Sequence, residues 1–209
     1  MEPDAVEIRV LGCLVEKQRT TPDAYPLSLN ALRLACNQST NRDPVAEYDE
    51  ATVVEALRRL ALRGWTRLAS GAGSRARKYR HLLDDAFGLN EAEISLLAVL
   101  MLRGPQTPGE LKQRGQRLHE FQGLTGVQDA LGVLVERGLV ARHERRPGQK
   151  EDRYEQLIGG EEARPTPEVA EADRNQPNRA PAEDRLTRLE REVAELRSEL
   201  AALRSELGA

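Results

Sequence analysis

The chain has 209 residues, of which 39% are hydrophobic, 3% are aromatic and 31% are charged. This composition suits compact helical cores and excludes a large β-sandwich, which needs more β-branched and aromatic residues. No apolar run reaches the roughly 20 residues that span a bilayer, and the acidic start of the sequence, MEPD, does not resemble a secretory signal. We therefore expect a cytoplasmic protein without a membrane segment.

The net charge of −3 is unevenly distributed along the chain. Residues 51–83 hold eight basic side chains and one acidic side chain, Glu55, whereas residues 86–160 hold ten of each sign. A basic block of this kind is typical of proteins that bind nucleic acid, because phosphates attract it. The alternative is a solvated charged surface in an arginine-rich protein, since the chain has 27 arginines and 4 lysines.

The first predicted element is a helix that begins after Asp4. Asp4 and Glu7 have the spacing of a capping box, and apolar residues recur at helical spacing from Ile8 onward. This helix contains Cys13, which forms no metal-ligand pattern with the other cysteine, Cys36. Both cysteines are therefore predicted to be small, buried hydrophobic side chains.

A polar loop follows the second predicted helix and extends over residues 36–44. Amide and guanidinium groups read base edges and hold phosphate oxygens. Four residues of the loop are therefore candidates for nucleic-acid binding: Asn37, Gln38, Asn41 and Arg42. The alternative is structural, because polar side chains in turns also satisfy the neighbouring backbone, and a long connection between helices needs internal bonds. The sequence leaves both interpretations open.

A third predicted helix, residues 50–63, leads through Gly64 into a β-hairpin with a turn at residues 71–74. The start of this helix, which usually meets the bases in DNA-binding proteins, is acidic and would repel phosphate. The hairpin is basic, so we expect DNA contacts to depend more on the hairpin and the phosphates than on base reading. The candidate contacts in this helix and hairpin are Arg58, Arg59, Arg75, Arg77, Lys78 and Arg80.

The same plan occurs a second time. Residues 93–108 align with residues 7–22 at an offset of 86, and residues 130–142 align with residues 56–68 at an offset of 74. Three helices followed by a hairpin form the winged-helix plan, a helix-turn-helix with a β wing. We predict a mainly α protein with small β wings, in which residues 1–85 and 86–158 form two tandem winged-helix domains.

The C-terminal part differs from both copies of this repeat. Residues 159–183 are rich in Glu, Pro, Ala, Arg and Asn and are predicted to be a disordered linker. Residues 184–207 carry the heptad seam of a coiled-coil helix, formed by Leu186, Leu189, Val193, Leu196, Leu200, Leu203 and Leu207. A parallel pairing would place opposite charges together at Arg185–Glu190, Glu192–Arg197 and Glu199–Arg204. We predict a parallel homodimer; a trimer and a helix folded back on its own body stay open.

Three segments resemble the YceH family of bacterial proteins. They are residues 16–45 (EKQRTTPDAYPLSLNALRLACNQSTNRDPV), residues 103–111 (RGPQTPGEL) and residues 146–154 (RPGQKEDRY). The late leucine heptad is similar to the same family, so the resemblance covers essentially the whole chain. It implies the tandem winged-helix fold and no particular activity.

The sequence lacks the motifs of an enzyme. The three histidines, His81, His119 and His143, have no metal-type spacing, and neither a Gly-rich phosphate loop nor a nucleophile elbow is present. We expect a protein without enzymatic activity, cofactor or metal. The first hypothesis is a DNA-binding protein, such as a transcriptional regulator, that contacts duplex DNA through its basic wing.

The second hypothesis is a scaffold that binds an unknown protein partner. Tandem winged helices serve this purpose in bacterial chromosome-segregation partners, although the analogy rests on the fold alone. The neutral second copy and the acidic start of the third helix favour the scaffold. The basic block at residues 51–83 favours DNA.

Overall fold

A computed structural model describes residues 2–69, 77–145 and 151–160. These residues belong to one compact unit that contains residues 1–164. The candidate residue Arg75, residues 161–183 of the predicted linker and the predicted heptad seam lie outside the described residues, whereas residues 159 and 160 are described and buried. Within the described ranges, no helix has both the length and the apolar character needed to cross a membrane.

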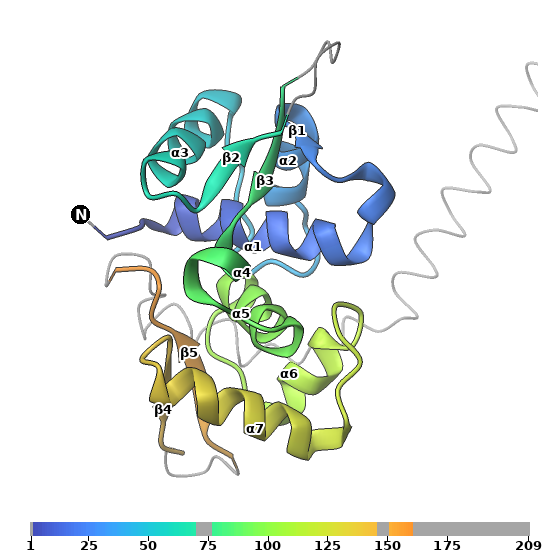
Figure 1. Cartoon of the computed structure of the whole chain (residues 1–209), viewed down its shortest axis with the longest axis vertical. Helices are drawn as coiled ribbons and strands as arrows, with labels where there is room; N and C mark the ends of the chain where they lie inside the picture. Colours follow the sequence, from blue (N-terminus) through green and yellow to red (C-terminus); the bar gives the residue numbers. More distant parts are fainter. Residues whose placement is uncertain (1, 70–76, 146–150, 161–209) are drawn as a thin grey trace, which may run out of the picture. The chain divides into compact units, whose positions relative to one another are not determined.

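The described part is mainly helical and carries two small antiparallel sheets (Figure 1). Its α-helices are α1 (Ala5–Thr20), α2 (Leu29–Cys36), α3 (Glu50–Leu62), α4 (Leu83–Phe87), α5 (Glu91–Arg103), α6 (Pro108–Gly115) and α7 (Gly123–Glu136), and a short 3-10 helix, η1, spans Pro22–Ala24. The first sheet has the order β1 (Leu27–Ser28), β3 (Lys78–His81), β2 (Thr66–Leu68), and the second pairs β4 (Val140–His143) with β5 (Arg153–Gln156). Three helices followed by a hairpin thus occur twice, which is consistent with a winged-helix-like fold.

Local sequence signals account for the ends of several helices. The capping boxes predicted for the first helix of each copy are present, with Asp4 before α1 and Asn90 before α5. Gly64 and Gly138 follow α3 and α7 with φ values of 74° and 67°, as expected for glycines that end helices. Two features were not predicted: β1 adds a third strand to the first sheet, and α4 spans the proposed domain boundary between residues 85 and 86.

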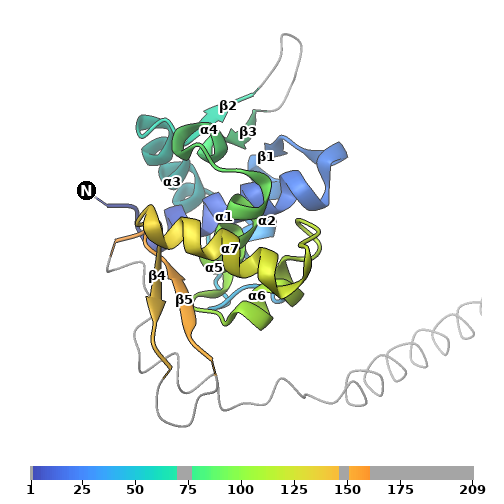
Figure 2. The same cartoon turned by 60° about the horizontal axis from the view of Figure 1, so that its bottom comes forward.

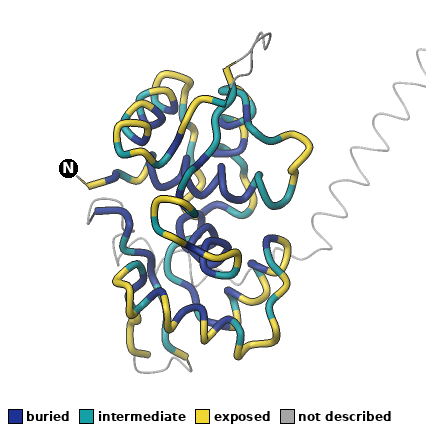
Figure 3. The backbone as a smooth tube through the Cα atoms, in the orientation of Figure 1, coloured by how far each residue is buried: buried dark blue, intermediate teal, exposed yellow. Residues whose placement is uncertain are grey.

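The equivalent helices of the two copies, α1 and α5, pack against each other and lie side by side in both views of the fold (Figures 1 and 2). Both helices are buried along most of their length, as the dark tube in Figure 3 shows. Apolar side chains of both copies therefore belong to one continuous core. The two copies of the repeat share this core rather than each enclosing its own.

Gly12 lets α1 approach α5 closely. A Cβ atom at this position would lie 2.9 Å from Leu102 Cγ and 3.1 Å from Met101 Cβ. We expect Gly12→Ala to lower the free energy of unfolding by about 1–3 kcal/mol, because the packed helices must separate. Gly132→Ala is the matched control, since a Cβ there has no neighbour within 4 Å, and a gain of about 0.5–1 kcal/mol is expected from helix propensity. Urea unfolding of both variants tests this, and equal shifts of the same sign would contradict the close packing.

Candidate nucleic-acid interface

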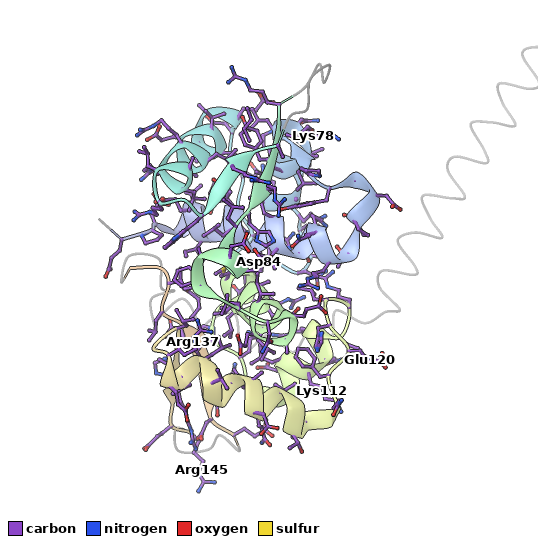
Figure 4. All side chains as sticks on the ribbon, viewed as in Figure 1. Lys78, Asp84, Lys112, Glu120, Arg137 and Arg145 are labelled. Carbon is purple, nitrogen blue, oxygen red and sulfur yellow. The ribbon has the colours of Figure 1, made fainter. Side chains whose placement is uncertain are left out.

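The first sheet gathers three basic side chains, Arg67, Lys78 and Arg80, on one side, which we call the basic face. The antiparallel register places Arg67 opposite Arg80 and Ser28 opposite Lys78. Opposed residues, and residues two apart on one strand, point to the same side of a sheet. The three cations therefore share one surface, and Lys78 is labelled on β3 in Figure 4.

Three residues on the other side of the same sheet are buried, and this fixes the orientation of the basic face. Leu27, Thr66 and His81 all lie on the inner side and are buried. A slip of one residue in the register would exchange the two sides of a strand. Burial of the inner side chains therefore holds the basic face toward solvent, where Arg67 is exposed.

Two arginines of the basic face, Arg67 and Arg80, bring like charges together. Arg67 and Arg80 oppose each other directly, and neither side chain forms a hydrogen bond or ion pair with another described residue. Arg80 Nε is buried without a hydrogen-bond partner, and the adjacent Arg77 is exposed. Like charges opposed in this way destabilise a sheet. They also create a local positive field that attracts polyanions.

The arginines of α3 are already paired with carboxylates. Arg58 Nη2 lies 2.7 Å from Glu55 Oε1 on the exposed surface of the helix. Arg59 Nη1 lies 2.9 Å from Asp4 Oδ2 and 3.7 Å from Glu7 Oε2, at the start of α1. Both arginines were predicted to contact nucleic acid, and the structure places each of them beside acidic groups that reduce its attraction for phosphate.

The polar loop between α2 and α3 uses its amides inside the protein. Asn37 Nδ2 donates to the Tyr48 carbonyl oxygen at 2.8 Å, and the Tyr48 backbone N–H donates to Asn37 Oδ1 at 2.9 Å. Asn41 has a φ of 60° and accepts a hydrogen bond from Arg103. These contacts support the structural interpretation of the loop, in which its polar groups order a long connection.

Arg42 lies at the centre of this loop and is only 6% exposed. Its Nε donates to the Ala35 carbonyl oxygen at 2.9 Å, while Nη2 donates to Glu16 Oε2 at 2.5 Å and to Gln38 Oε1 at 2.8 Å. Burial raises the pKa of Glu16, but the hydrogen bond from Arg42 and the nearby positive charges together outweigh burial and lower the pKa below its usual value. The donors of Arg42 thus serve the interior, which again favours the structural interpretation.

His81 lies directly beneath the basic face. Its Nε2 is 2.5 Å from Gln18 Oε1, and its Nδ1 accepts a hydrogen bond from the Leu83 backbone N–H at 3.3 Å. Burial lowers the pKa of His81 to about 4 from its ordinary 6.5, although Asp84, 3.6 Å away, acts in the opposite direction. A neutral histidine is therefore built into the support of the sheet.

Sequence analysis singled out Lys78 and Arg80 but did not include Arg67 among the candidate contacts. Arg67 belongs to the basic face only because it stands opposite Arg80 in the register. Strand alternation was the available signal, but it does not specify which residues of two strands face each other. The prediction that Cys13 and Cys36 are buried is confirmed. No group of metal-ligating side chains occurs within the described ranges.

Comparison with known proteins places the chain among bacterial relatives. A family model described as "Protein of unknown function, DUF480" matches residues 4–149, a span that includes nearly all of the first copy of the repeat and most of the second. The chain belongs to the DUF480 family. It is 49% identical to a UPF0502 protein of Geotalea uraniireducens, over 91% of this chain and 88% of the relative. A UPF0502 protein of Solibacter usitatus is 46% identical over 92% of each chain, so the similarity to UPF0502 proteins covers most of the chain.

Proposed function

We propose that this DUF480 protein binds duplex DNA through the basic face of its first sheet and acts as a transcriptional regulator without enzymatic activity. The observation that supports the proposal is the opposition of Arg67 and Arg80, with Lys78 on the same side. Cations fixed in this way release counterions from DNA when they contact phosphates, so binding is steeply salt-dependent. Because Glu55 pairs with Arg58 on α3, base reading contributes little to this interface.

The second sheet offers an internal comparison, because its charges are largely neutralised. Arg142 Nη2 lies 2.5 Å from Asp152 Oδ2, and His143 Nε2 lies 2.7 Å from Glu155 Oε2. Arg153 is 3.1 Å from Glu110. These pairs support a division of roles in which the first copy contacts DNA and the second contributes little affinity.

The proposal extends to architecture. The two copies are tandem winged-helix domains of a cytoplasmic protein, and the YceH family that the sequence resembles is the same group as DUF480. Residues 184–207 would join two chains as a parallel coiled coil. Two linked basic faces would bind neighbouring stretches of one duplex with higher avidity than either alone.

Replacing Arg67, Lys78 and Arg80 together by glutamine tests the DNA contact. The slope of log K against log salt concentration should become shallower by about three, at roughly one unit for each lost phosphate contact. Fluorescence anisotropy of the full chain with mixed-sequence duplexes between low and moderate salt measures the slope. The matched control replaces three exposed cations of the second copy, Lys112, Arg142 and Arg145, by glutamine and should keep the original slope.

A second candidate function, a scaffold for a protein partner, is favoured by the solvent side of α3. Val54 is 44% exposed and Leu62 is 76% exposed on this helix. Exposed apolar side chains beside the neutral Arg58–Glu55 pair would contact a protein partner more favourably than they would contact DNA. Absence of DNA binding by the unmodified chain would favour the scaffold, whereas an unchanged salt slope in the triple variant would exclude the basic face as the contact surface.

A further inference from the structure

A small surface cavity lies where the two copies of the repeat meet, and we call it the seam cavity. Residues of α1, of the polar loop, of α5 and of the segment that includes α6 line it. Its polar lining consists of Glu16, Asn41, Arg103, Arg114 and Arg117. Three guanidinium groups and one carboxylate thus surround one opening.

The single carboxylate of the seam cavity, Glu16, is already paired with arginines. Glu16 is buried, lies 2.5 Å from Arg42, and also contacts Arg117. Arg103 donates to the side chain of Asn41, which is neutral. The lining therefore keeps a positive excess that its own acid does not cancel.

Arg114 is the cation with the most available donors. Its Nη2 lies 3.8 Å from Glu110 Oε1, beyond hydrogen-bond distance, and its side chain forms no hydrogen bond with another described residue. Glu110 is in turn 3.1 Å from Arg153. The Arg114 guanidinium is consequently placed at the cavity with most of its N–H groups directed to no protein acceptor in the described part of the chain.

The crowding of cations affects Arg103. Burial lowers the pKa of Arg103, and the nearby charges of Arg114, Arg117 and Arg42 lower it further, although Asp43 acts in the opposite direction. An anion placed among these groups would relieve their mutual repulsion. Guanidinium groups bind tetrahedral oxyanions through paired N–H donors, which match the spacing of phosphate oxygens.

We propose that the seam cavity binds a phosphate group, supplied either by inorganic phosphate or by the phosphate end of a small organic molecule. The cavity is too small to enclose a phosphate, so the anion would lie at its mouth, where the Arg114 and Arg117 side chains are partly exposed, and any organic remainder would extend into solvent. The site is built from other elements than the basic face and does not depend on DNA binding. Because its lining comes from both copies, the bound anion would also strengthen their association.

The test uses the full chain with inorganic phosphate and with phenyl phosphate, each compared with chloride at constant ionic strength. We expect a saturable rise in the thermal unfolding midpoint and saturable heat in titration calorimetry. Arg114→Gln should weaken binding by about tenfold or more, because it removes charge-assisted hydrogen bonds. Arg145→Gln is the control, since Arg145 is exposed and labelled at the far end of the second hairpin in Figure 4.

A second variant, Arg114→Lys, separates geometry from charge. It keeps the cation but loses the paired donors, so we expect an affinity between those of the original chain and Arg114→Gln. Stronger binding of phenyl phosphate than of inorganic phosphate would identify an organic phosphate as the ligand, and the reverse would identify the free ion. Absence of saturable binding for both ligands, or equal affinity in the original chain and Arg114→Gln, would overturn the proposal.

Discussion

Replacing Arg42 with alanine is expected to lower the free energy of unfolding by about 3–5 kcal/mol. Arg42 is the buried partner of Glu16, and both side chains are almost completely enclosed. Its removal leaves a buried carboxylate with too little compensation, and the Ala35 carbonyl oxygen loses a donor. Because Arg117 still contacts Glu16 from the surface, we expect the lower end of this range.

Urea unfolding followed by circular dichroism at neutral pH measures the effect of the Arg42 variant. Arg58→Ala is the matched control, because Arg58 also pairs with a glutamate but lies on the surface of α3, and its unfolding midpoint should hardly change. The double variant Glu16→Gln/Arg42→Met removes both charges and should recover part of the lost stability. Similar losses for Arg42→Ala and Arg58→Ala would show that burial does not govern the strength of the pair.

Lowering the pH from 7 to 4 is expected to remove roughly 3 kcal/mol of stability through His81 alone, given its pKa of about 4 in the folded protein. The unfolded chain takes up a proton near pH 6.5, whereas the folded chain resists it until about pH 4. Between these values the unfolded state binds more protons, so stability falls as the pH falls. The loss begins below about pH 6.5 and is complete below the folded pKa.

The contribution of His81 can be isolated by comparing two variants. His81→Gln keeps a side chain that can bond Gln18 but cannot take up a proton, so its stability should vary less between pH 6.5 and 4 than that of the original chain. His143→Gln removes an exposed histidine of β4 and should retain the full acid loss. If His81→Gln and the original chain lose the same stability over this interval, other groups are responsible.

The fold was predictable where its signals are local in the sequence. The capping residues Asp4 and Asn90 and the helix-ending glycines act within one helical turn, and the structure has them as expected. The repeated order of elements was also predictable, because similar segments recur along the chain. The packing of α1 on α5 was not predictable. Gly12 permits this close approach, but the sequence does not show that Leu102 lies beside it.

The candidate site was predictable in composition but not in arrangement. A basic hairpin was evident from charge, whereas the opposition of Arg67 and Arg80 depends on a register that the sequence does not specify. The polar loop could not be interpreted either, because the same groups suit DNA or the interior. The partners of these groups decide between the two uses, and the partners are distant in the sequence. Asn37 bonds Tyr48, 11 residues later, and Arg42 bonds Glu16, 26 residues earlier.

The shared core has a consequence for assembly, because α1 and α5 are equivalent helices that meet face to face. An interface in which one patch meets its own counterpart is the isologous arrangement of a two-fold dimer. The pairing of α1 with α5 joins two equivalent helices of a single polypeptide, so it does not depend on protein concentration as an interface between separate subunits would. Each half is then free to carry different surface chemistry, and the cations of the first sheet and the neutral ion pairs of the second are one such asymmetry.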